Sequence, residues 1–232
     1  MQAEDRPIHF SSELIHAPKP LHVPALQRLY FELSQTRAAY MNTDFSPQAP
    51  PRFHSRRGRQ SQSLLVFLPD RLLVAEEWVD LSFRDFLDRL DTVAHHAIPL
   101  LELGAIQAQV GTVRTTFALT HFQDARAFLL ERVCAQEGRL APFLARPVAV
   151  GGLRFVLPAT PEHPGNLHVT IESYQRSRNE VYVEVKGIYL NQNITADNAS
   201  QLSENLKRVR DFISQSVQPY LAQFDLSTGA RD

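Results

Sequence analysis

The segment from Leu64 to Trp78 constrains the fold more than any other part of the chain. It reads LLVFLPDRLLVAEEW, with two apolar runs on either side of Pro69 and Asp70. Proline presets the first central position of a β-turn and aspartate suits the second, so the pattern predicts a hairpin with a two-residue loop. Phe67 would then face Leu72, and both faces of the ribbon would be apolar. Such a ribbon is typical of a central strand pair that is covered on each side, by helices or by a second copy of the protein.

Helices and further strands are expected around this ribbon. Ser82 is an N-cap residue with Asp85 three positions later, and the apolar stripe that follows predicts a helix up to Ala97. Gly111 marks a bulge or a close backbone approach within a strand. Further helices are predicted over residues 25–40, 122–136 and 198–224, and strands over 8–15, 106–119, 146–158, 166–175 and 180–190.

The order of these elements predicts an α+β fold, in which antiparallel sheets in hairpin order carry long amphipathic helices. The pattern divides into two similar lobes, residues 1–145 and residues 146–232, which one continuous domain can also accommodate. Neither a Walker A pattern nor a Rossmann fingerprint is present, so no cofactor is expected.

Composition excludes some classes of partner. The 232 residues are 44% hydrophobic and carry a formal net charge of -1, which gives no global attraction to nucleic acid or anionic lipid. No apolar run is long enough to span a bilayer, and the acidic start MQAEDRP does not resemble a signal peptide. The one cysteine, Cys134, cannot form an intramolecular disulfide. A cytoplasmic protein without membrane contact is therefore expected.

Two arginine-rich turns are candidate anion sites. The stretch RFHSRRGRQSQS places arginines around Gly58, a natural turn residue, and a second basic turn lies between two strands of the second half. One interpretation is a solvated turn that protects the sheet edge from aggregation. The other is a weak site for phosphate groups of nucleic acid or a nucleotide, if both turns lie at the same end of the sheet. The residues concerned are Arg52, Arg56, Arg57, Arg59, Arg176 and Arg178.

A pair of carboxylates, Glu172 and Glu184, is the candidate metal site. A three-residue loop at residues 177–179 keeps the apolar residues of both neighbouring strands on one face and places these two glutamates opposite each other. Like charges in direct opposition are unfavourable. They would share a proton, bind a divalent cation, or be neutralised by a base such as Lys186.

The first half of the chain resembles a sporadically distributed family of uncharacterised bacterial proteins. The similar segments are IHFSSELI, LLVFLPDRLLVAEEW, LSFRDFLDRLDTV and VGTVRTTFAL, which together cover roughly residues 8 to 120. In the last segment Gly111 and Arg114 match the family's usual pattern, whereas Thr115 and Thr116 replace an aromatic residue and an asparagine. The resemblance implies the α+β fold and a bacterial cytoplasmic origin, and it implies no activity.

Three functions therefore stay open. The preferred one is a non-catalytic interaction or adaptor protein that self-associates, most simply as a dimer, because the ribbon is apolar on both faces and no catalytic signature appears. The second is a nucleic-acid or nucleotide phosphate binder that uses the arginine turns. The third is a metal-dependent hydrolase built on the paired carboxylate.

Overall fold

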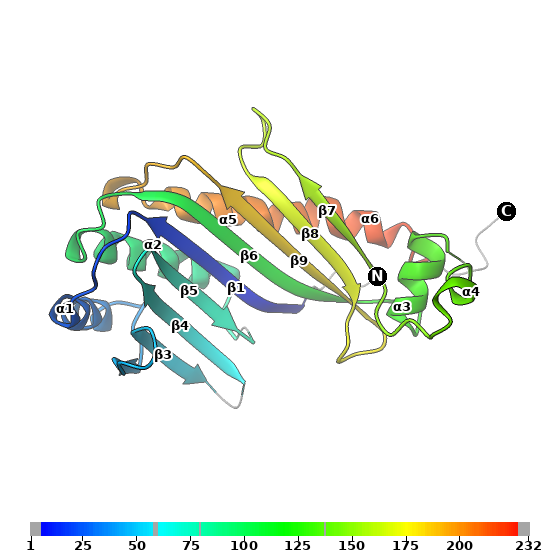
Figure 1. Cartoon of the computed structure of the whole chain (residues 1–232), viewed down its shortest axis with the longest axis horizontal. Coiled ribbons are helices and arrows are strands. Elements are labelled where there is room, and N and C mark those ends of the chain that lie inside the picture. The colour runs from blue at the N-terminus through cyan, green and yellow to red at the C-terminus, as the bar shows by residue number, and fades with distance from the viewer. Residues whose placement is uncertain (1–5, 58–59, 79, 137, 227–232) are drawn as a thin grey trace.

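The strands form one antiparallel sheet. The computed structural model describes residues 6–57, 60–78, 80–136 and 138–226, and the nine strands found there follow the order β2-β3-β4-β5-β1-β6-β9-β8-β7 (Figure 1). The strands are β1 (Arg6–His16), β2 (Asn42–Asp44), β3 (Arg52–Arg57), β4 (Ser61–Leu68), β5 (Arg71–Glu77), β6 (Ile106–Ala118), β7 (Gly152–Leu157), β8 (Asn166–Ser173) and β9 (Glu180–Tyr189). The expected α+β class with antiparallel strands is confirmed, and hairpin order holds for β2–β5 and β7–β9 but not for the neighbours of β1 and β6 at the centre.

The predicted hairpin around Pro69 and Asp70 is confirmed in its register. Leu68 pairs with Arg71 and Phe67 with Leu72, as the two-residue loop requires. One face of this β4–β5 ribbon is fully buried, and the side chains of the other face are partly exposed. Local turn chemistry therefore determined the register, while only one of the two apolar faces is completely covered.

The strand order is symmetric about the β1–β6 pair. Strands β5, β4 and β3 extend outward from β1 in the same order as β9, β8 and β7 extend outward from β6. Although β6 precedes residue 145, it pairs with β9 along its length. The two halves of the sequence thus share a single sheet.

Helices cover one face of this sheet (Figure 1). The longer ones are α1 (Val23–Ser34), α2 (Phe83–Leu100) and α5 (Ser200–Phe212), and α5 continues through the π-helical turn η3 (Ile213–Val217) into α6 (Gln218–Ala222). The shorter ones are α3 (Ala125–Ala127), η1 (Phe128–Val133), α4 (Ala141–Leu144) and η2 (Ala196–Asn198). No helix in the described part of the chain is long and apolar enough to cross a membrane.

The start of α2 agrees with the sequence pattern. Asp85 donates its backbone N–H to Ser82 Oγ, and the Asp85 carboxylate accepts from the Ser82 backbone, so both members of the capping box are in place. The box satisfies two backbone donors that a helix start leaves unpaired, which fixes where α2 begins.

Two other helices differ from the expectation, and the C-terminal helix is irregular near Pro219, where the sequence predicts a kink or an end. Helix α1 ends at Ser34, because the hydroxyls of Ser34 and Thr36 donate to carbonyls of its last turn and compete with continued helix. The helix expected over residues 122–136 is reduced to α3 and the π-helical turn η1. The C-terminal helix contains the turn η3 just before Pro219, which has no N–H to donate to the preceding turn.

Helices α2 and α5 sit next to each other over the centre of the sheet. The ring of Phe86 in α2 lies 5.6 Å from that of Phe10 in β1. In the other half, Leu206 of α5 lies over Gly111 of β6, where an added Cβ would be 2.8 Å from Leu206 Cδ1. Of the two interpretations of Gly111, close backbone approach is correct, since pairing continues through it without a register shift.

Candidate functional site

Strand β7 ends the sheet with exposed apolar side chains. Phe155 and Leu157 point toward the helix-covered face, and 41% and 38% of their surfaces, respectively, are exposed to solvent. Val156 points to the opposite face and is 58% exposed. Arg154 shares that opposite face, so β7 is apolar on the helix-covered face and mixed on the other. Exposed apolar side chains in a row are unusual on an edge strand, since edges are commonly blunted by charge, proline or a covering element.

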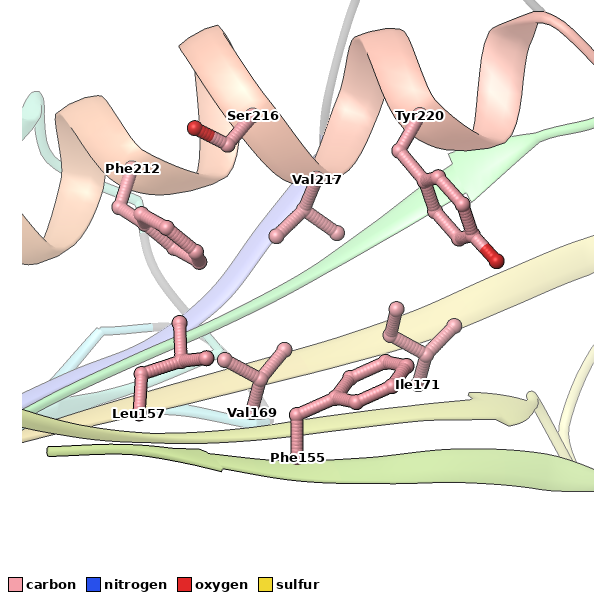
Figure 2. A pocket seen from close by; sticks show the side chains of 8 residues that line it. All are labelled: Phe155, Leu157, Val169, Ile171, Phe212, Ser216, Val217 and Tyr220. Atoms are coloured by element: carbon pink, nitrogen blue, oxygen red, sulfur yellow. The ribbon is translucent and has the colours of Figure 1, made fainter.

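An apolar groove lies between this edge and the C-terminal helix (Figure 2). Its volume is about 240 Å³. Side chains of β7 and β8 form one wall, and side chains of the α5–η3–α6 helix form the other. The lining residues are Phe155, Leu157, Val169, Ile171, Phe212, Ser216, Val217 and Tyr220.

Strand register and helix periodicity position these side chains. Phe155 pairs with Val169 in β8, and alternate residues of both strands point toward the helix layer. On the helix, Phe212, Ser216 and Tyr220 recur every four residues and therefore share one face. The floor of the groove is buried at Val169, whereas Phe155 remains exposed at its rim.

The groove is lined mainly by apolar side chains and can therefore accept an apolar partner. None of its lining residues is an acid, a histidine, a lysine or a cysteine, and its polar groups are the hydroxyls of Ser216 and Tyr220. Apolar surface that stays exposed beside a buried floor is typical of binding sites for other macromolecules.

The strand pairings place the two arginine turns at the same end of the sheet, and three of the six arginines have partners of their own. Arg52 lies at the start of β3 and forms an ion pair with Asp44 at 2.9 Å, so it is at the opposite end of that strand from the turn. The guanidinium of Arg176 lies 4.3 Å from the ring centroid of Trp78. Arg178 forms an ion pair with Asp124 at 3.3 Å.

The remaining arginines, Arg56, Arg57 and Arg59, lie at or just after the C-terminal end of strand β3. Arg56 is exposed near the end of β3, the side chain of Arg57 is not described, and Arg59 lies outside the described residues. Weak anion binding at this turn stays a prediction. Its test is salt-dependent retention on heparin, which the joint change of Arg56, Arg57 and Arg59 to alanine should abolish.

The predicted register of the carboxylate pair is wrong by two residues. Glu172 pairs with Tyr182, and Glu184 pairs with Thr170, so the two glutamates are diagonal neighbours. The loop is longer than expected because pairing stops near Ser173, where the N-terminus of α3 is attached to the turn through a hydrogen bond from Ala125 N to Arg178 O.

The base that accompanies Glu184 is also different from the expected Lys186. Arg114 Nε donates to Glu184 Oε2 at 2.6 Å, and the Tyr182 hydroxyl donates to the same oxygen at 3.2 Å. Within the described residues, no group of three or more His, Cys, Asp or Glu side chains is arranged to hold a metal ion. The direct opposition of Glu172 and Glu184, on which the metal hypothesis was based, is not present in the observed register.

A polar row on the open face of the sheet was not anticipated from the sequence. His9 in β1 pairs with Glu77 on one side and Arg114 on the other, and Arg114 pairs in turn with Glu184. Burial, together with the charge of Arg114, lowers the pKa of His9 from 6.5 to about 4. His9 is therefore neutral and lies between Glu77, which accepts a hydrogen bond from Gln62, and Arg114, which is ion-paired with Glu184.

Comparison with known proteins adds little to this geometry. No family model and no curated protein matches the chain. Among solved structures the chain is similar to the di-domain ARO/CYC StfQ from the steffimycin biosynthetic pathway, at 10% identity over 94% of this chain and 98% of that chain, with a TM-score of 0.23. A likeness of that size carries no conclusion about the function of this chain.

Proposed function

We propose that the chain is a non-catalytic interaction protein that self-associates through the exposed edge of strand β7. The observation that supports this most directly is the exposure of Phe155, Val156 and Leu157 along a strand that has no neighbour on its outer side among the described residues. Two copies of such an edge pair most simply about a two-fold axis, which joins two sheets into one and places the exposed apolar side chains of the two strands next to each other.

The other features of the sheet favour this edge over the alternatives. Strand β2 at the opposite edge has only three residues, Asn42, Thr43 and Asp44, which is too short and polar to attract a second strand. On the open face of the β4–β5 ribbon the apolar side chains are already partly buried. The sequence predicted a dimer that forms through the apolar β4–β5 ribbon. We propose instead that the dimer contact is the edge of strand β7.

Sedimentation equilibrium between low and high micromolar concentrations tests the proposal. The unmodified chain should approach twice the mass of one 26.3 kDa chain as concentration rises. Val156→Lys places a charge on the edge without touching the groove and should leave a monomer. Leu190→Lys is the matched control, because Leu190 is 55% exposed but lies outside β7, and it should still dimerise.

A mass of one chain at every concentration would contradict the proposal. So would equal dimerisation of the Val156→Lys and Leu190→Lys variants, because self-association would then use another surface.

A further inference from the structure

The two ends of the sheet are built from equivalent residues. In the N-terminal half, Phe53 of β3 pairs with Leu65 of β4, which pairs with Val74 of β5. In the C-terminal half, Phe155 of β7 pairs with Val169 of β8, which pairs with Val185 of β9. Both rows face the helix layer, so Phe53 and Phe155 occupy corresponding positions beside α2 and beside α5–α6.

A helix covers only the first of these positions. Tyr30 of α1 lies 5.2 Å from Phe53 between ring centroids, and Leu26, Leu29 and Leu33 of α1 are fully buried. Helix α1 also packs against α2. Phe53 is consequently 0% exposed, whereas its counterpart Phe155 is 41% exposed.

The segment that corresponds to α1 by chain order does not fill the second position. It lies between β6 and β7 and forms α3, η1 and α4, which gather beyond the end of the sheet (Figure 1). None of its residues lines the groove. The groove is therefore the C-terminal counterpart of the space that α1 occupies in the N-terminal half.

We propose that this groove binds an amphipathic helix of a partner protein, lying beside α5–α6 as α1 lies beside α2. This inference rests on the proposed interaction function and names the partner of the same region. The pattern of α1 defines the expected chemistry: apolar residues at positions i, i+3 and i+7 and an aromatic residue at i+4, on a face without charge.

The dimensions agree with a helix of two to three turns. The helix wall of the groove runs from Phe212 to Tyr220, which is roughly 12 Å at the α-helical rise, and the α1 residues from Leu26 to Leu33 span roughly 10 Å. One short helical segment thus covers the whole length of the groove.

A second copy of this chain is a poor source for that helix. The apolar faces of α1, α2 and α5 are already buried against their own sheet. Helix α4 does expose Phe143 and Leu144, but it has only four residues. Within the described residues, no other helix of the length required has an uncovered apolar face, which favours a different protein as the partner.

The binding test uses a fluorescently labelled synthetic peptide of residues 22–37, because this α1 sequence carries the expected pattern. Anisotropy titration with the full-length chain should give micromolar binding. Ser216→Arg places a long charged side chain in the groove from an exposed position and should weaken binding about thirtyfold, as for loss of an interface hot spot. Gln215→Arg, exposed on the same helix but outside the groove, should bind as the unmodified chain does.

Two further measurements show whether the peptide binds in the groove and does so as a helix. A free peptide of this length is mostly unfolded, so the far-ultraviolet circular dichroism of the mixture should gain helix signal on binding. A peptide with Leu29→Asp should not bind. Phe155→Asp provides a second groove variant if Ser216→Arg fails to fold, and it should also lose the peptide.

The outcomes distinguish this inference from the proposed function. Absence of peptide binding, or equal binding by Ser216→Arg and Gln215→Arg, would overturn the helix proposal whatever the oligomeric state. If Ser216→Arg also dissociates a dimer that Gln215→Arg retains, a second copy fills the groove and the proposal of a different partner fails. Retained peptide binding by a monomeric Val156→Lys variant would support the groove independently of self-association.

Discussion

Truncation of the two corresponding phenylalanines should have very different costs. Phe53→Ala removes a ring that is 0% exposed and lies within 4.8 Å of the ring of Phe67, measured between centroids. Buried Phe→Ala changes cost about 3–5 kcal/mol, because the lost transfer energy is joined by the cost of a cavity.

Phe155→Ala should cost much less. Full burial of a phenylalanine side chain contributes about 1.5–3 kcal/mol, and with 41% of Phe155 still exposed only about three fifths of that is at stake, or about 1–2 kcal/mol. No closed cavity is left, since the groove is open to solvent. The difference between the two variants should thus be about 2 kcal/mol or more.

Urea unfolding provides the measurement, with Trp78 fluorescence and far-ultraviolet circular dichroism recorded together to check that both report one transition. With a slope of about 2.5 kcal/mol/M, the midpoint should fall by about 1.5 M for Phe53→Ala and by about 0.6 M for Phe155→Ala. Equal midpoint shifts would mean that Phe155 is as well covered as Phe53, and the interpretation of the groove as an unfilled helix position would be refuted.

Two other predictions concern buried charge. Arg89 forms an ion pair with Glu76, and both side chains are nearly inaccessible to solvent. Arg89→Met leaves the Glu76 carboxylate buried without this partner and should destabilise the protein by about 3–5 kcal/mol. Combining Arg89→Met with Glu76→Leu should restore much of that loss in the same urea assay. If the double variant is no more stable than the single one, the cost does not come from the buried carboxylate. Because the pKa of His9 is lowered, His9 takes up a proton below pH 6.5 in the unfolded chain but only near pH 4 in the folded chain. The free energy of unfolding should therefore decrease as the pH is lowered from about 6.5 to about 4, by at most about 3 kcal/mol. His9→Gln should make that part of the pH profile flatter, and an unchanged slope would show that His9 is not its cause.

Features that depend on neighbouring residues could be predicted from the sequence. Pro69 and Asp70 specify a two-residue turn, and the observed pairs across β4 and β5 follow from it. Ser82 and Asp85 likewise specify the start of α2 through a capping box three residues long. In both cases the determining contacts lie within a few positions along the chain.

Features that depend on distant contacts could not be predicted. The register of β8 and β9 differs from the expected one because the turn between them is bound by Asp124 and Ala125, more than fifty residues earlier. The partner of Arg176 could not be predicted for the same reason, since the ring beneath it belongs to Trp78 in the other half of the chain. A pattern of turn residues does not specify which distant side chain they meet.

The groove was also beyond sequence analysis, although its residues are visible there as apolar positions. The strand that contains Phe155 and the helix that contains Tyr220 were both expected, and their apolar patterns are typical of a sheet and a helix that pack against each other. Whether they are covered depends on where the segment between β6 and β7 packs. That segment forms the short elements α3, η1 and α4 beyond the end of the sheet, and the exposed edge is the result.

Hydrogen–deuterium exchange of the full-length chain, with and without the peptide of residues 22–37, tests the central claim most directly. If the groove is the counterpart of the α1 position, the peptide should slow exchange over residues 152–171 and 212–222 and leave residues 52–67 unchanged. Protection of residues 52–67 instead, or no protection of either region at saturating peptide, would contradict the account.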